Sequence, residues 1–109
     1  MEMKVHEALK RYGHGNAIPT KTLAAILGFS TVRELQKQIE RERCAGAVIL
    51  SDPRGGGYYL SNDPVELRRF TKTLNARAQN TLRAARSAQQ ALDAAEGQES
   101  VAGWYDENG

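Results

Sequence analysis

Apolar residues recur at helical spacing near the start of the chain. Val5, Ala8, Leu9 and Tyr12 fall at positions i, i+3, i+4 and i+7. This spacing places them on one face of a helix, which we expect to begin near Met3. Gly13 and Gly15 are expected to end this helix.

A second and a third helix follow in quick succession. The second is expected to start at Pro19, with Thr20 as its N-cap and an apolar face formed by Leu23, Ile26 and Leu27. A short turn, Gly28-Phe29-Ser30, separates it from the third. Two short helices around a tight turn are typical of a helix-turn-helix.

The third helix has a clear start signal. Thr31 and Glu34 are spaced as a capping box, in which hydroxyl and carboxylate each accept a backbone amide. Val32, Leu35 and Ile39 are then expected to point to the core. The polar residues that this turns toward solvent are Arg33, Gln36, Lys37, Glu40 and Arg41.

A β-hairpin is predicted after the third helix. Branched and aromatic runs at 48–50 and 58–60 flank the segment Ser51-Asp52-Pro53-Arg54-Gly55-Gly56-Gly57. Apolar runs around a loop rich in proline and glycine are typical of paired strands. Of Tyr58 and Tyr59, one is expected to be buried.

The remaining chain predicts one long helix and a tail. Asn62-Asp63-Pro64 is a strong helix start, and the helix is expected to reach about Ala95. Leu67, Phe70 and Leu74 should pack on the preceding domain. Beyond them the apolar stripe thins to Ala78, Leu82 (or Thr81), Ala85, Ala88 and Leu92. Because long isolated helices are marginally stable in water, we expect this helix to pair with a second copy as a coiled coil.

These elements give a mainly α fold with a small β-hairpin: a winged helix-turn-helix followed by one long C-terminal helix. The boundaries expected are 1–61 for the winged domain, 62–96 for the long basic helix and 97–109 for an acidic, disordered tail. Trp104-Tyr105 is the apolar exception within that tail, and an inert tail is the favoured interpretation.

The net charge of +2 hides a strong asymmetry along the chain. Residues 1–92 contain 15 basic and 8 acidic residues, which leaves them at +7, whereas the last 17 residues contain 5 acids and no base. A basic body favours polyanionic partners. Six of the bases and no acid lie between Arg68 and Arg86, so this segment is either a solvated face or a phosphate-binding surface.

Other classes of function find little support. No apolar run is long enough to predict a membrane span, and the single cysteine, Cys44, gives no disulfide framework, so we expect a cytoplasmic protein. His6 and His14 lack the neighbouring ligands of a metal site. No catalytic constellation is present, and neither an enzyme nor a cofactor is predicted.

The stretch Leu27-Gly28-Phe29-Ser30-Thr31-Val32-Arg33-Glu34-Leu35, with the hairpin 48–60, resembles the biotin-repressor-like winged helix-turn-helix domains of bacteria and their phages. The resemblance covers about half the chain and implies a helix that enters the major groove of DNA. The long basic helix departs from that family, and no ligase domain is present. Winged helices also bind RNA or proteins, so the fold alone does not fix the task.

Within this interpretation the third helix and the wing carry the candidate DNA contacts. Exposed Arg, Lys and Gln side chains near the start of a recognition helix suit base edges, and basic residues elsewhere suit phosphate. Arg54 before three glycines is typical of a wing tip, although a plain flexible loop fits equally well. The predicted DNA-binding residues are Ser30, Thr31, Arg33, Gln36, Lys37, Arg54, Arg68, Arg69 and Lys72.

The function favoured by these features is binding of double-stranded DNA, sequence-specific or general, by a homodimeric bacterial or phage regulator of transcription. A two-fold dimer would select a palindromic site. Two alternatives stay open: a protein–protein interaction module built on the winged fold and long helix, or a phage DNA-replication or packaging accessory. Binding of single-stranded nucleic acid or RNA ranks last, because few aromatic residues are free to stack on bases.

Overall fold

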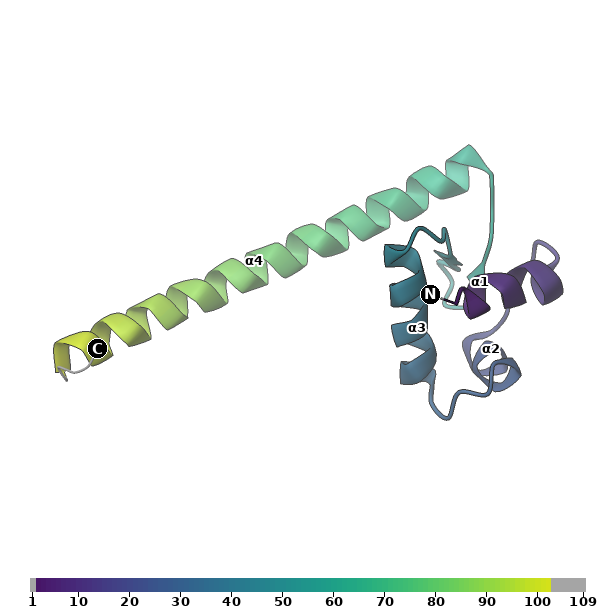
Figure 1. Ribbon diagram of the computed structural model, residues 1–109. Helices are drawn as coiled ribbons and strands as arrows, with labels where there is room; N and C mark the ends of the chain where they lie inside the picture. Colours follow the sequence, from purple (N-terminus) through teal and green to yellow (C-terminus); the bar gives the residue numbers. More distant parts are fainter. Residues whose placement is uncertain (1, 103–109) are drawn as a thin grey trace. The chain divides into compact units, whose positions relative to one another are not determined.

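The computed structural model describes residues 2–102, with side chains through residue 97 (Figure 1). The chain divides into two compact units, Met1–Phe70 and Thr71–Gly109, which are described separately. The elements in order are α1 (Lys4–Ala8), the π-helix η1 (Leu9–Gly13), α2 (Thr20–Ile26), α3 (Val32–Cys44), β1 (Leu50–Ser51), β2 (Tyr58–Tyr59) and α4 (Pro64–Ala102). The predicted fold class is confirmed: mainly helical, with a two-stranded hairpin and one long C-terminal helix.

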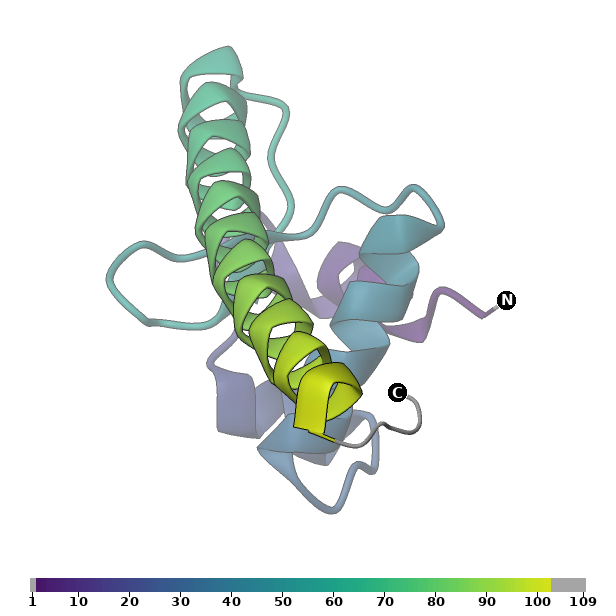
Figure 2. The ribbon, with the colours of Figure 1, turned by 90° about the vertical axis from the view of Figure 1, so that its left-hand side faces the viewer.

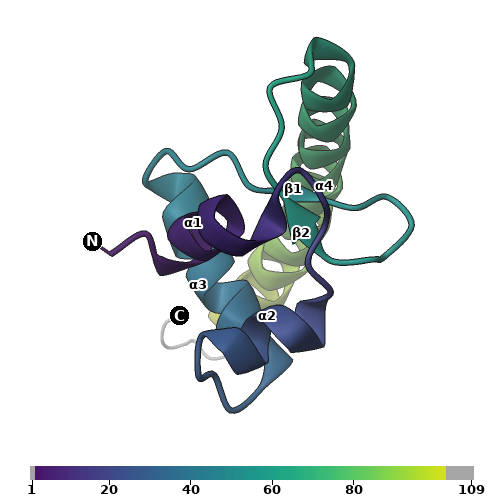
Figure 3. The same cartoon turned by 90° about the vertical axis from the view of Figure 1, so that its right-hand side faces the viewer.

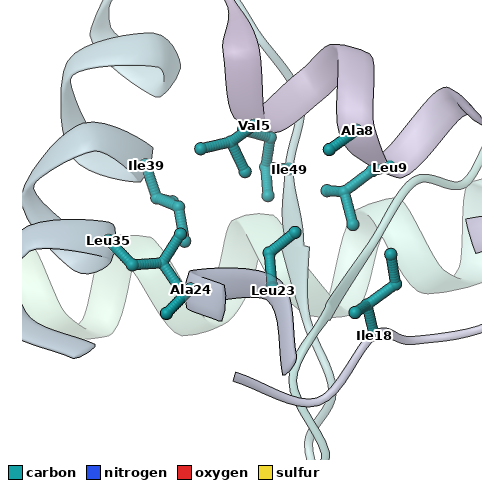
Figure 4. Packing of buried hydrophobic residues seen from close by; sticks show 9 residues of the cluster. All are labelled: Val5, Ala8, Leu9, Ile18, Leu23, Ala24, Leu35, Ile39 and Ile49. Carbon is teal, nitrogen blue, oxygen red and sulfur yellow. The ribbon is translucent and has the colours of Figure 1, made fainter. Parts of the chain in front are cut away.

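One hydrophobic core holds the first unit together. Side chains from α1, η1, α2, α3 and the segment before β1 converge in Figure 4. Its buried members are Val5, Ala8, Leu9, Ile18, Leu23, Ala24, Leu35, Ile39 and Ile49. Burial of apolar area on this scale is the main force that orders three short helices, none of which is stable alone.

The first helical segment is not a regular α-helix throughout. Val5, Ala8 and Leu9 are buried as predicted, but Tyr12 is 52% exposed, which corrects the expectation for that residue. The chain passes into the π-helix η1 at Leu9. A π turn takes more residues than an α turn, so Gly13 rather than Tyr12 returns to the buried face.

Two details of the second helix also differ from the prediction. Pro19 occupies the N-cap position, and Thr20 is already the first helical residue. Ile26 is 44% exposed, whereas Ala24 is buried beside Leu23. The buried face of α2 is therefore formed by Leu23 and Ala24, and Ile26 lies outside it.

The turn of the helix-turn-helix is slightly longer than predicted, because α2 ends at Ile26. Gly28 adopts φ 76°, a conformation that favours glycine. The Phe29 amide donates to the Ala24 carbonyl at 2.9 Å, and the Phe29 ring packs against the core. Phe29 therefore anchors the corner of the helix-turn-helix.

The hairpin is antiparallel, with Leu50 opposite Tyr59 and Ser51 opposite Tyr58. Its strands are shorter than the predicted runs, and Val48 is half exposed. Tyr59 is the buried tyrosine of the pair. We call the loop 52–57 the wing; it projects beyond the helices of the unit in Figure 3.

A third segment joins the hairpin, which the sequence pattern did not predict. Ile18 forms an isolated antiparallel bridge with Tyr58, through N–H···O bonds of 2.9 and 3.1 Å. Gly57, at φ 116°, passes directly beside this bridge, and a Cβ there would overlap the Ile18 carbonyl. The last wing glycine is therefore needed for close approach of two backbones.

Arg43 fastens the hairpin to α3. Its guanidinium donates to the Ile49 carbonyl at 2.9 and 2.7 Å and to the Ser51 hydroxyl at 3.1 Å. The same group lies 4.9 Å from the centre of the Phe70 ring. A basic residue of α3 is thus engaged in the structure rather than offered to a ligand.

The long helix α4 begins at Pro64, as predicted, with the Asp63 carboxylate accepting the Val65 amide at 3.0 Å. It is one continuous helix in Figures 1 and 2 and runs to Ala102, past the predicted end near Ala95. The tail expected at 97–109 thus begins in helical residues. Trp104 and Tyr105 lie outside the described residues.

Candidate nucleic-acid interface

The solvent face of α3 carries the predicted base-reading side chains. Leu35, Gln38, Ile39 and Glu42 occupy the buried face of the helix. Arg33, Gln36 and Lys37 lie on the opposite side and are exposed. Residues three and four apart share one face of a helix, so these three form a contiguous polar surface on the first two turns. We call this the α3 surface.

These three side chains make no polar contact with the described part of the protein. Within residues 2–97, the Arg33, Gln36 and Lys37 side chains make no hydrogen bond, ion pair or ring contact. Their donors are therefore satisfied only by solvent. Five guanidinium donors, an ammonium and an amide in this arrangement match the acceptors of base edges and phosphates.

The start of α3 is closed by its own capping box. Glu34 accepts the amides of Ser30 at 2.9 Å and Thr31 at 3.2 Å, and the Thr31 hydroxyl accepts the Glu34 amide at 3.1 Å. This confirms the predicted cap. These backbone donors are occupied, so Ser30 and Thr31 can offer a ligand only their exposed hydroxyl groups.

The wing presents Arg54 at an exposed position. The Arg54 amide donates to the Asp52 carboxylate at 3.0 Å, and the Gly55 amide donates to the Asp52 carbonyl at 2.9 Å. These bonds shape the loop and occupy backbone donors that a phosphate would otherwise use. Within the described residues, the guanidinium of Arg54 makes no such bond.

Arg68 and Arg69 lie at the start of α4, in the first unit, and differ in their surroundings. Arg68 is exposed. The Arg69 guanidinium donates to the Tyr59 hydroxyl at 3.2 Å, and the Tyr59 hydroxyl donates to the Glu66 carboxylate at 3.4 Å. Glu66 also accepts from the Ser61 hydroxyl. Arg69 therefore has a structural role that the sequence pattern did not indicate.

The pKa of Tyr59 is shifted by burial and by these two charged neighbours. Burial raises the pKa of its phenol above 10.0, and the nearby Glu66 carboxylate raises it further. The guanidinium of Arg69 partly offsets both effects. The phenol thus stays protonated and holds Glu66 and Arg69 in place.

Lys72, the last of the predicted contacts, is exposed and belongs to the second unit. The basic residues farther along α4, Arg77, Arg83 and Arg86, are exposed as well. The Arg83 guanidinium donates to the Asn80 side chain at 2.8 Å. The predicted contacts in the turn before α3 and on its first two turns therefore lie together in the first unit, namely Ser30, Thr31, Arg33, Gln36 and Lys37, whereas Lys72 belongs to the second unit.

The described residues also bear on metal binding and on membrane insertion. No group of three or more His, Cys, Asp or Glu residues gathers there to hold a metal ion. Among the same residues, no helix combines the length and apolar character needed to cross a membrane. Cys44 is a free, exposed thiol.

Comparison of the chain with protein families, with characterised proteins and with solved structures returns no match.

Proposed function

We propose that this protein binds double-stranded DNA, with the α3 surface in the major groove and the wing against the neighbouring backbone. The proposal rests on one observation: the side chains of Arg33, Gln36 and Lys37 make no hydrogen bond, ion pair or ring contact within residues 2–97. Three long polar side chains stand side by side on the solvent face of the second helix of a helix-turn-helix. In such folds this helix face reads base edges.

Electrostatics would bring the duplex to the protein before any base is read. Lys37 and Arg33 on α3, Arg54 on the wing and Arg68 at the start of α4 are exposed cations of the first unit. Each phosphate contact releases condensed counterions. Four phosphate contacts would give a slope of log K against log salt of about −3.6, and three, with Arg33 on a base edge, a slope of about −2.7.

The surface also carries features that favour discrimination. Gln36 can bond two edge atoms of adenine, and Arg33 two of guanine. Glu40 lies one turn beyond Gln36 on the same exposed face, and repels phosphate that comes too close. A helix with this mixture is expected to prefer some duplexes. The resemblance to bacterial and phage winged-helix domains supports a role in the regulation of transcription.

The test is fluorescence anisotropy with a labelled random-sequence duplex, at low and moderate salt. The variant Arg33→Ala/Lys37→Ala/Arg54→Ala removes three cations from the proposed interface. The control Lys10→Ala/Arg11→Ala/Arg83→Ala removes three exposed cations from other positions. Because both lose the same net charge, they separate a local surface from a general attraction.

The proposal requires salt-sensitive binding that falls at least about tenfold in the interface variant, since each lost contact weakens the electrostatic term. The control variant should retain most of the affinity. Equal losses in both variants would show charge attraction without an interface. No binding by the wild type at low salt would overturn the proposal and favour a protein–protein interaction module.

A further inference from the structure

The second unit carries an exposed apolar stripe. The stripe is formed by Ala78, Leu82, Ala85, Ala88 and Leu92 of α4. Leu82 and Leu92 are each 49% exposed, and all five residues are classed as exposed. Residues 78 and 92 lie seven positions from Ala85, close to two helical turns, so the stripe runs straight along one face.

The spacing of the stripe is symmetric about Ala85. A step of three residues leads to Leu82 on one side and to Ala88 on the other, and a further step of four leads to Ala78 and to Leu92. If a second copy packs antiparallel with the two Ala85 residues level, each leucine is level with an alanine of its partner. The central layer then holds two alanines, and each of the four layers around it holds one leucine and one alanine, so no layer has to fit two leucines.

A parallel pair would be poorly matched along the same stripe. Leucine would then face leucine and alanine would face alanine, so two wide layers, at Leu82 and Leu92, would stand among three narrow ones. Glu96, eleven residues after Ala85 and close to three turns away, lies on the stripe as well. A parallel arrangement would bring the two Glu96 carboxylates together, which like charges oppose.

The charges of α4 favour the antiparallel choice. Between Arg68 and Arg86 the helix contains six basic residues and no acid, and from residue 93 onward all charged residues of the chain are acidic. An antiparallel pair lays residues 68–77 of each copy, which include four of the six bases, along residues 93–102 of the other. Arg77 of one copy is then within about one turn of Glu96 of the other, a separation that a long side chain can span.

We propose that two copies of this chain associate through an antiparallel pairing of α4 centred on Ala85. The pairing would bury Leu82 and Leu92, which α4 leaves half exposed on its own. It rests on the geometry of α4 alone and does not depend on DNA binding. The failure of either proposal therefore leaves the other standing.

Site-specific cross-linking of the full chain tests the orientation. The background is Cys44→Ser, because Cys44 is the only cysteine and is exposed. Ala85→Cys alone should cross-link to its own copy on oxidation. Leu92→Cys alone should not, because its two copies are about 21 Å apart along the axis. A mixture of Ala78→Cys and Leu92→Cys chains should form the mixed dimer.

Self-cross-linking of Leu92→Cys with the efficiency of Ala85→Cys would overturn the proposal in favour of a parallel pair. A monomer in sedimentation equilibrium, or a dimer without any of these cross-links, would also overturn it.

Charge reversal gives a second measurement that leaves the apolar stripe intact. Arg77→Glu should weaken dimerisation in sedimentation equilibrium, and Arg77→Glu/Glu96→Arg should restore it. Arg83→Glu, on the opposite face of the helix, is the matched control and should leave dimerisation near that of the wild type. Equal weakening by Arg77→Glu and Arg83→Glu, or no recovery in the double variant, would contradict the proposed pairing.

Discussion

The buried carboxylate of Glu42 accepts the backbone amide of Val5 at 2.9 Å, across 37 positions of the sequence. It also accepts the His6 amide at 2.9 Å and the side-chain amide of Gln38 at 2.8 Å. The first amides of α1 have no partner within their own helix. Glu42 of α3 therefore caps α1 and ties the start of the winged unit to its central helix.

Replacing Glu42 should destabilise the protein strongly. Glu42→Leu leaves the Val5 and His6 amides without their partner, and we expect a loss of about 2–4 kcal/mol in the free energy of unfolding. Glu42→Gln keeps the shape and one acceptor, so the loss should be smaller. Urea unfolding followed by circular dichroism measures both. The exposed neighbour Glu40→Leu is the control, and an equal loss there would refute the capping role.

Arg43 should control the attachment of the hairpin. In Arg43→Met the aliphatic stem stays, but the bonds to Ile49 and Ser51 and the contact with the Phe70 ring are lost. We expect a loss of about 1.5–3 kcal/mol in stability, typical of hydrogen bonds to a charged group. Hydrogen exchange should speed up first at the hairpin amides. Unchanged exchange at Tyr58 and Asp52 would contradict this role.

The wing glycines should respond differently to substitution. Gly57→Ala forces a Cβ against the Ile18 carbonyl at φ 116°, and strain of this kind costs about 1–3 kcal/mol. Gly55 also has a positive φ, 78°, but a Cβ there meets nothing within 4 Å. Gly55→Asn should therefore be nearly neutral, since asparagine tolerates this conformation. Thermal unfolding of the two variants measures the difference. Similar melting temperatures for Gly57→Ala and Gly55→Asn would contradict the special role of Gly57.

Tyr59 should make stability depend on alkaline pH. Its pKa is raised above 10.0 in the folded protein, chiefly by burial and then by Glu66. The protonated Tyr59 phenol contributes its full share of the free energy of unfolding below pH 10. This contribution is lost as the pH rises through the raised pKa, because ionisation of Tyr59 favours the unfolded chain. Tyr59→Phe should reduce this alkaline decline, whereas Tyr58→Phe should not. Urea unfolding across this pH range measures the difference, and identical declines would contradict the assignment.

The sequence predicted helix starts correctly where the signal is a motif of a few neighbouring residues. The capping box of Thr31 and Glu34 and the start at Asp63-Pro64 are short-range patterns, and both are present. The exposed face of α3 followed from the same periodicity. The candidate contacts on α3 could therefore be predicted from spacing alone.

The errors arose mainly where distant segments decide the outcome. The bridge between Ile18 and Tyr58 joins residues 40 positions apart, and no sequence pattern predicts it. The π turn that removes Tyr12 from the core is local, but the hydrophobic spacing does not distinguish it from an α turn. The sequence pattern assigned no role to Glu42 or Arg43. Glu42 accepts amides of α1 that lie 36 and 37 positions away, and Arg43 binds the hairpin. Such contacts depend on tertiary packing, which a single sequence does not display.

The most direct test of DNA binding is a nuclear magnetic resonance titration of the isotopically labelled full chain with a short duplex. Binding through the α3 surface and the wing predicts that the largest amide shifts fall between Ser30 and Lys37 and around Arg54. They should fade as salt is added, because the contacts include phosphates. Shifts confined to α4 beyond Thr71, or no shifts at low salt, would contradict the proposed interface.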